Sequence, residues 1–256
     1  MSDVHKAALW MSDIHGKMNV MRKEPFGVGS FVHVVKRGSR GLPIVKDEGD
    51  RQRFLLMLAH FNDTHMPLNW YRDLVDESVV GSFKRPSAWP DQEPLIAIHG
   101  FCLLDNHFHL LLEEIRDEGI AQFMKRLGVG MVKRFNEKYH ERGSLFQGSY
   151  RAKTIDDENY LKYVSVYIHV KNAFDVYPDG YERACRNFDR AYAWAQKYPY
   201  CSLGDYSGEH TRPLIKKEML GELFTTSEYD EFAKEMIQQR QEFQKEIREH
   251  AQGHFE

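Results

Sequence analysis

The sequence has few cysteines and no long apolar run. Its three cysteines, Cys102, Cys185 and Cys201, lie far apart and outside any Cys-x-x-Cys pattern, which argues against a disulfide framework or a zinc finger. No segment reaches the roughly 18 consecutive apolar residues of a membrane-spanning helix. The N-terminus lacks the basic and apolar regions of a secretory signal. We therefore expect a cytoplasmic protein.

A strong positive charge is also absent. The 256 residues contain 35 Lys and Arg against 38 Asp and Glu, a net charge of −3, which disfavours a generic DNA-coating protein. The charge is uneven, however, because the segment from Arg116 to Lys153 holds nine basic and four acidic residues. With 42% hydrophobic residues the chain can bury a core. The composition thus indicates a globular protein with a local basic surface.

Strand-like and helical segments alternate along the chain and predict an α+β fold. The β-branched, aromatic and alternating segments are 30–36, 95–104, 107–113 and 143–153. The segments with apolar residues at helical spacing are 50–60, 120–139 and 157–172. We expect Asp50 and Asp156 to cap the first and last of these helices. This order favours an antiparallel sheet covered by helices on one face.

The same segments suggest how the chain is divided. Residues 1–28 read as an N-terminal extension, and residues 29–174 as the main domain. Residues 62–94 contain several prolines and are interpreted as an insertion with a short helix. Residues 175–256 are expected to be a mostly helical C-terminal region of charged helices.

Two histidines flank Phe108 in a strand-like segment. Side chains two residues apart on a strand point to the same face, so His107 and His109 are expected to project together. Two imidazoles on a rigid strand form a suitable metal platform. His-x-His is a weak signal by itself, and two strand histidines satisfied by hydrogen bonds are the structural alternative.

Tyr167 lies in the helical segment 157–172 and is a candidate nucleophile. A tyrosine in such a helix is more often a half-buried packing residue. As a nucleophile it needs activation, because its ordinary pKa is about 10. A divalent metal ion beside a phosphate is one means of activation.

Three blocks together resemble the single-tyrosine HUH transposases, especially the REP-associated tyrosine transposases. Leu104-Asp-Asn-His-Phe-His-Leu-Leu-Leu112 resembles the His-hydrophobic-His motif of that family. Gly143-Ser-Leu-Phe-Gln-Gly-Ser-Tyr-Arg-Ala-Lys153 is similar to its Gly-x-Leu-Phe-Gln-Gly block. Tyr160-Leu-Lys-Tyr-Val-Ser-Val-Tyr-Ile-His169 resembles its nucleophile helix, and His33-Val-Val-Lys-Arg-Gly38 fits its opening strand. The resemblance spans roughly residues 31–174.

The resemblance implies a fold, a reaction and partners. The fold would be a ferredoxin-like antiparallel sheet. The function would be cleavage and rejoining of single-stranded or hairpin DNA, through a 5′-phosphotyrosine intermediate, in DNA transposition or repeat-element processing. Tyr167 would be the nucleophile, and His107 and His109 would bind Mg²⁺ or Mn²⁺. The family also implies a homodimer.

The sequence departs from the family pattern after the tyrosine. The family usually places Asn or Gln four residues on, as a third metal ligand, where this chain has Lys171, followed by Asn172. A protonated lysine has no lone pair for a metal, and five residues along an α-helix turn a side chain away. Asn172 could serve through a distorted helix end, water or Glu113 could replace it, or the site could be degraded.

A few basic residues are candidate phosphate contacts. They lie in the loop after the first strand and in the strand near 151: Lys36, Arg37, Arg40, Arg151 and Lys153. At Gly148-Ser149, where the family usually has a basic residue, this chain has none. The alternative to the enzyme is a catalytically impaired relative that binds hairpin DNA or RNA without cleavage. A small zinc hydrolase is disfavoured, because a third ligand is not evident.

Overall fold

The computed structural model describes residues 26–252, with side chains through residue 240, so residues 1–25 of the predicted N-terminal extension 1–28 lie outside the described part. Its centre is a four-stranded sheet of order β2-β3-β1-β4. The strands are β1 (Phe31–Arg37), β2 (Ile96–Leu103), β3 (His107–Glu114) and β4 (Arg151–Ile155). All neighbouring strands pair antiparallel.

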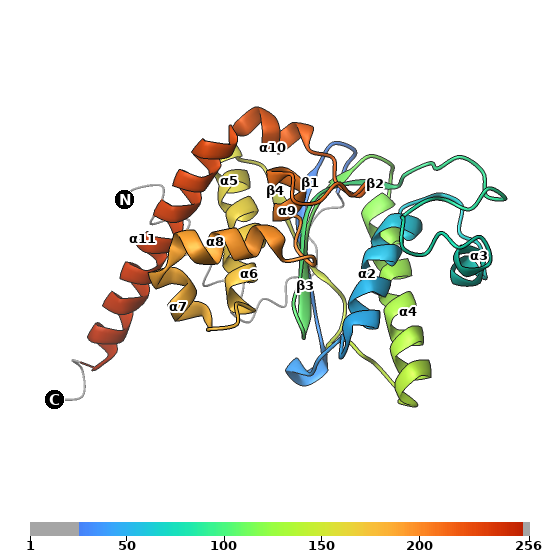
Figure 1. The fold of residues 1–256 in the computed structure, drawn as a ribbon, viewed down its shortest axis with the longest axis horizontal. Coiled ribbons are helices and arrows are strands. Elements are labelled where there is room, and N and C mark those ends of the chain that lie inside the picture. The colour runs from blue at the N-terminus through green and yellow to red at the C-terminus, as the bar shows by residue number, and fades with distance from the viewer. Residues whose placement is uncertain (1–25, 253–256) are drawn as a thin grey trace.

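The order of elements along residues 26–155 is that of a ferredoxin-like fold. Helix α2 (Glu48–Phe61) connects β1 to β2, and α4 (Gly119–Tyr139) connects β3 to β4. Figure 1 shows the sheet nearly edge-on, with α2 and α4 side by side on one of its faces. The predicted α+β, ferredoxin-like fold is confirmed. Helices α2 and α4 share one face of the sheet, as expected, whereas the third predicted helix, residues 157–172, packs on the opposite face.

Strand alternation explains this arrangement. Val32 and Val34 of β1 and Phe108 and Leu110 of β3 point toward α2 and α4 and join one buried cluster with Phe123 of α4. The residues between them on each strand point to the opposite face. Because both faces of the sheet are covered, β2 is buried along its whole length.

The C-terminal helices cover the second face of the sheet. They are α5 (Glu158–Val166), the π-helical turn η2 (Tyr167–Lys171), α6 (Asn172–Asp175), α7 (Tyr181–Arg186), α8 (Phe188–Lys197), α9 (Leu203–Ser207), α10 (Glu218–Leu223) and α11 (Thr226–Gln252). In Figure 1 these elements lie on the side of the sheet away from α2 and α4. No helix of the described part of the chain is long and apolar enough to cross a membrane.

A segment of this C-terminal layer also pairs with the outer edge of β2. The amide of Leu103 donates to the carbonyl of Tyr200, the amide of Ser202 to that of Phe101, and the amide of Lys216 to that of Ile98. These bonds satisfy groups that an edge strand would otherwise expose. They also attach the C-terminal layer to the strand beside β3.

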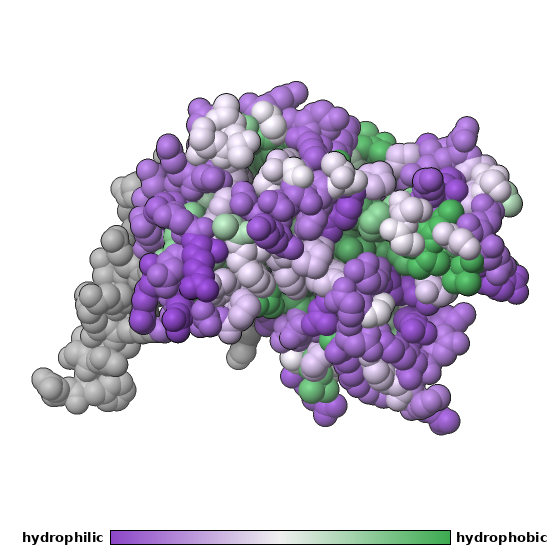
Figure 2. All heavy atoms as spheres, viewed as in Figure 1, coloured by the Kyte–Doolittle hydropathy of each residue, from purple (hydrophilic) through white to green (hydrophobic). Residues whose placement is uncertain are grey.

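The segment 62–94 contains one short helix, α3 (Trp70–Asp76), and loops that pack outside α2. Trp70 contacts Phe61 of α2 edge-on, with ring centroids 4.9 Å apart. Leu68 is 97% exposed. Figure 2 shows apolar atoms gathered on this side of an otherwise hydrophilic face.

Two helix caps differ from the predicted ones. Asp47, not Asp50, caps α2, because its side chain accepts a hydrogen bond from the amide of Asp50. Asp157, not Asp156, caps α5 by accepting from the amide of Tyr160. In each case the capping residue is the one with extended backbone angles.

Candidate active site

His107 and His109 lie on the face of β3 that the C-terminal layer covers. Phe108, between them, is fully buried on the opposite face. The two imidazole ring centroids are 5.0 Å apart. Strand alternation thus brings the two predicted histidines together, as their spacing suggested.

Asn106 determines which nitrogen of His107 carries the proton. The amide nitrogen of Asn106 donates to the carbonyl of Gly41 at 3.1 Å. Its amide oxygen therefore faces His107, whose Nδ1 lies 2.6 Å away. Because that oxygen can only accept, Nδ1 of His107 is the donor, and the neutral ring has its lone pair on Nε2.

His33 of β1 contacts His109 from the neighbouring strand. His33 Nε2 and His109 Nδ1 are 2.9 Å apart, and the two rings stack with centroids 5.2 Å apart. His33 is 3% exposed. Burial, together with the charge of Lys153, lowers the pKa of His33 to about 4, so its imidazole is neutral at neutral pH.

Tyr167 opens the π-helical turn η2 and lies against these histidines. Its ring centroid is 5.4 Å from that of His109 and 6.1 Å from that of His33, both edge-on. The residue is 1% exposed. Burial raises the pKa of the Tyr167 phenol to about 12, while Arg240 and Arg37 act in the opposite direction. The phenol is therefore protonated and enclosed in this conformation.

Two cations lie over the Tyr167 ring. Lys171 Nζ is 5.2 Å from the ring centroid, and the Arg240 guanidinium carbon is 5.9 Å from it. Lys171 also bonds the carboxylate of Asp175 at 2.5 Å. Arg240 comes from α11, so the C-terminal helix contributes directly to the surroundings of the tyrosine.

The π-helical turn changes the position of Asn172 relative to Tyr167. The backbone N–H of Asn172 donates to the carbonyl of Tyr167, five residues earlier. In an α-helix that bond joins residues four apart, and the bonded pair shares a face. A π-helical turn is one residue longer. Asn172 therefore shares a helix face with Tyr167, as the fourth residue after it would in an α-helix.

The Asn172 side chain is fully buried, and its amide atoms are unsatisfied. Neither the amide oxygen nor the amide nitrogen has a hydrogen-bond partner within residues 26–240. Burying an amide without partners is costly, so native proteins rarely do it unless a ligand or water completes the bonding. The sequence could suggest Asn172 only if its helix was distorted, and the structure contains that distortion.

The donor set is compatible with a divalent metal ion bound by mixed ligands. Within the described residues, no group of three or more His, Cys, Asp and Glu side chains is arranged to hold a metal. His107 and His109 would therefore need a ligand of another type. Asn172 offers an amide oxygen, whereas Glu113 is engaged by His99 at 3.0 Å.

The predicted phosphate contacts are divided between two faces. Arg37 lies opposite His107 in the sheet register, and Arg151 and Lys153 lie opposite Val35 and His33. All three residues are therefore on the histidine face. The two others lie elsewhere: Lys36 bonds the carbonyl of Gly148 on the α4 side, at 3.1 Å, and Arg40 is in the turn η1 (Ser39–Gly41).

Sequence reasoning missed three residues of this site. His33 and Asn106 were recognised only as members of the family motifs, without a role of their own. Their contacts depend on strand register and on a turn, which local patterns do not give. Arg240 lies in a charged helix that has no motif. Its position depends on how α11 packs against the rest of the chain.

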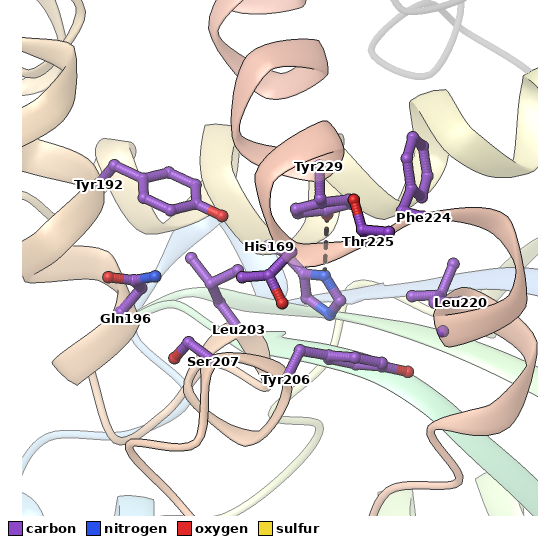
Figure 3. A pocket seen from close by; sticks show the side chains of 12 residues that line it. His169, Tyr192, Gln196, Leu203, Tyr206, Ser207, Leu220, Phe224, Thr225 and Tyr229 are labelled. Atoms are coloured by element: carbon purple, nitrogen blue, oxygen red, sulfur yellow. Dashed lines mark hydrogen bonds between the residues drawn. The ribbon is translucent and has the colours of Figure 1, made fainter.

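A cavity lies away from this site, in the C-terminal layer. Figure 3 shows Tyr192, Tyr206 and Tyr229 around His169, whose Nδ1 bonds the Tyr229 hydroxyl at 3.1 Å. His169 Nε2 bonds Ser202 at 2.8 Å. The cavity measures about 110 Å³, below the roughly 300 Å³ at which ligand pockets begin. His169 thus joins helices to the sheet rather than binding a ligand.

Comparison with known protein families finds a match to the central part of the chain. Residues 91–171 match the family described as "Transposase IS200 like". The matched span includes both histidines of β3 and the tyrosine of η2. This match agrees with the resemblance to single-tyrosine HUH transposases that the motifs carry.

The solved structure described as "Structure of the REP associates tyrosine transposase bound to a REP hairpin" aligns over 78% of this chain and 91% of that one, with 11% identity and a TM-score of 0.40. A TM-score of this size is too low to support a functional inference. A search of curated proteins returned no match.

Proposed function

We propose that this transposase-family protein cleaves and rejoins single-stranded or hairpin DNA, with Tyr167 as nucleophile. The observation that carries the proposal is the contact between the Tyr167 ring and His109, with centroids 5.4 Å apart, beside a second strand histidine. A nucleophile and two metal-binding imidazoles on one sheet face are the parts that such a reaction requires.

The reaction is a transesterification at a DNA phosphodiester. The Tyr167 oxygen forms a bond to phosphorus, and the bond from phosphorus to the 3′ oxygen breaks. The product is a 5′-phosphotyrosine and a free 3′-OH, with the phenol proton transferred in net to the 3′ oxygen. Attack by a 3′-OH on the phosphotyrosine reverses the step and rejoins DNA. Arg240 and Arg37 favour the phenolate that develops during the first step, because their charges lower the pKa of the Tyr167 phenol.

His107, His109 and Asn172 would hold the divalent ion, Mg²⁺ or Mn²⁺. The unsatisfied amide of Asn172 and the Nε2 lone pair of His107 support this assignment. When bound, such an ion neutralises phosphate charge and orients its oxygens. The protein's own residues position the nucleophile and exclude water around it.

The buried phenol indicates that this conformation precedes DNA binding. Tyr167 packs in one cluster with Ala233, Met236 and Ile237 of α11, and Arg240 lies over its ring. A DNA strand reaches the phenol only if these side chains move. We therefore expect α11 to shift when DNA binds.

Basic residues on the histidine face would bind the DNA backbone. Arg37 and Arg151 are exposed. Arg37 lies opposite His107 in the sheet, and Arg151 lies opposite Val35, the residue that faces His109 on the other side. Lys153 would extend this surface on the same face, and Arg40 would bind DNA only beyond the end of β1, in the turn η1. Lys36 would contribute indirectly, because its ammonium group bonds Gly148 and lies over Phe146 at 4.6 Å.

The proposal is tested by trapping the covalent intermediate. A pool of hairpin-containing single strands, labelled at either end, is incubated with the protein and Mn²⁺ or Mg²⁺. The 3′-terminal label should stay with denatured protein, whereas the 5′-terminal label should be released on a fragment ending in 3′-OH. Tyr167→Phe should abolish the adduct. Tyr163→Phe is the matched control and should leave the adduct intact. Tyr163 lies on α5, just before the π-helical turn, and its ring contacts Phe232 of α11.

A second candidate function is binding of hairpin DNA or RNA without cleavage. It is favoured by the burial of the phenol and by Lys171 at the usual ligand position. The trapping experiment separates the two functions. Hairpin binding without an adduct under either metal would favour the binding module.

The family also implies a homodimer, which we include in the proposal. Light scattering of the purified chain should give about twice the monomer mass of 30.1 kDa. A monomer that still forms the adduct would remove the dimer from the proposal and leave the chemistry intact.

A further inference from the structure

His33 is a third imidazole at the candidate site, and neither its strand nor its spacing relates it to the His-x-His motif. It lies on β1, two register positions from the residue that faces His109, and is almost fully buried. It contacts the ring of His109 on one side and the edge of Tyr167 on the other. His33 therefore contacts both a proposed ligand and the proposed nucleophile.

His33 makes its polar contact with Nδ1 of His109, which leaves Nε2 of His109 available to bind a metal. His33 Nε2 lies 2.9 Å from His109 Nδ1. A neutral imidazole has one N–H and one lone pair, so one ring must donate and the other accept. If His109 donates from Nδ1, its lone pair is on Nε2, as a metal ligand requires.

The neighbouring histidine indicates which direction applies. His107 is also engaged through Nδ1, at 2.6 Å from the Asn106 amide oxygen, which can only accept. Both strand histidines are thus held at the same ring atom by an adjacent side chain. Metal-binding histidines commonly donate their other N–H to such a partner, which fixes the tautomer and the ring orientation.

We propose that His33 is a positioning residue that accepts the Nδ1 proton of His109 and so presents Nε2 of His109 as a metal ligand. This inference rests on the proposed function, since it assigns His109 to the metal. His33 itself is not a ligand. Its edge contact with Tyr167 keeps the nucleophile in line with the oriented ring.

The tautomer is measured directly by ¹⁵N NMR of histidine side chains in the full-length, metal-free protein. We expect His109 to carry its proton on Nδ1 in the wild type and to lose that preference in His33→Phe, which keeps the ring and removes the acceptor. His33→Gln, whose amide oxygen can reach the position of Nε2 and accept there, should restore it in part. A wild-type His109 protonated on Nε2 would overturn the inference.

Mn²⁺ titration by calorimetry supplies the second readout. His33→Phe should weaken Mn²⁺ binding by about 10- to 100-fold, the usual effect of losing such a partner, and His33→Gln should recover part of it. His60→Phe is the matched control, because His60 is an equally buried imidazole on α2. His60→Phe should bind as the wild type does.

The outcomes separate this inference from the proposed function. Wild-type affinity in a folded His33→Phe protein would overturn the role of His33 while the metal site stands. If the wild type binds no Mn²⁺ but His109 shows the His33-dependent tautomer, the proposed metal site fails and the hydrogen-bond assignment stands. Circular dichroism of each variant identifies those that fail to fold. If His33→Phe is among them, His33→Gln provides the test.

Discussion

The backbone N–H of Asn172 donates to the carbonyl of Tyr167, five residues earlier, and so closes a π-helical turn at the proposed nucleophile. The turn compensates for the one-residue offset between Lys171 and Asn172. π-Helical turns are rare, because the extra residue weakens the helix. Those that occur are frequently found at functional sites. The burial of an unsatisfied Asn172 amide points to the same conclusion.

Replacing Asn172 should separate stability from metal binding. An unsatisfied buried amide costs about 1–3 kcal/mol, so Asn172→Leu should raise the free energy of unfolding of the metal-free protein by about 1 kcal/mol. The same variant should bind Mn²⁺ at least tenfold more weakly. Urea denaturation and calorimetry measure the two effects.

Asn62→Leu is the contrasting variant. In the wild type, the amide oxygen of Asn62 accepts from the backbone N–H groups of Leu95 and Ile96, and its amide nitrogen donates to the Ile96 carbonyl. Losing these bonds should lower stability and leave Mn²⁺ affinity unchanged. If Asn172→Leu behaves like Asn62→Leu in stability, the Asn172 amide is satisfied in solution and its assignment as a ligand loses its basis.

The Tyr167 phenol should make the protein sensitive to alkali. Its folded pKa is about 12, above the ordinary value of about 10, so the folded state holds the proton more tightly. This contribution is complete below pH 10 and is lost as pH rises toward 12. Between pH 8 and pH 11, the free energy of unfolding of Tyr167→Phe should therefore fall by about 1 kcal/mol less than that of the wild type, as measured by urea denaturation. Equal losses would show that the phenol is solvated.

Arg240 should lower the pKa of this phenol and assist its ionisation. Removing the guanidinium in Arg240→Gln should raise the Tyr167 pKa further and slow adduct formation severalfold, without changing Mn²⁺ affinity. Site-selective ¹³C-tyrosine NMR follows the pKa. Lys234→Gln is the control on the same helix, because Lys234 bonds Asp189 and lies over Phe188. Identical rates for the two variants would exclude Arg240 from the reaction.

The parts of this site that follow from local pattern were predictable. Strand alternation gave the pairing of His107 with His109, and the order of elements gave the sheet. The remaining features depend on long-range packing. The register of β1 against β3 brings His33 to His109, and the packing of α11 brings Arg240 to Tyr167. The π-helical turn also has no local signature, because it involves a single additional residue within an otherwise ordinary helix.

Acid should destabilise the protein through His169. Burial lowers its pKa to about 3, and both ring nitrogens bond to side chains of the C-terminal layer. Its folded pKa lies below the ordinary value of about 6.5, so the stability associated with the neutral ring is complete above that pH and is lost as pH falls. Between pH 6.5 and pH 5 this loss is about 2 kcal/mol. His169→Gln should show a flatter dependence of unfolding free energy on pH, and an unchanged slope would assign the acid sensitivity to other groups.

Salt dependence of binding should identify the DNA-binding face. Each phosphate contact to a single strand contributes a slope of about 0.7 to the fall of log affinity with log salt. Arg37→Gln and Arg151→Gln should each reduce the slope by about that amount and weaken binding at low salt, because both residues are exposed on the histidine face. Lys125→Gln, exposed on α4 on the other side of the sheet, should leave the slope unchanged. A larger effect from Lys125 than from Arg37 and Arg151 would place the DNA on the α2 and α4 face, where it has no route to Tyr167.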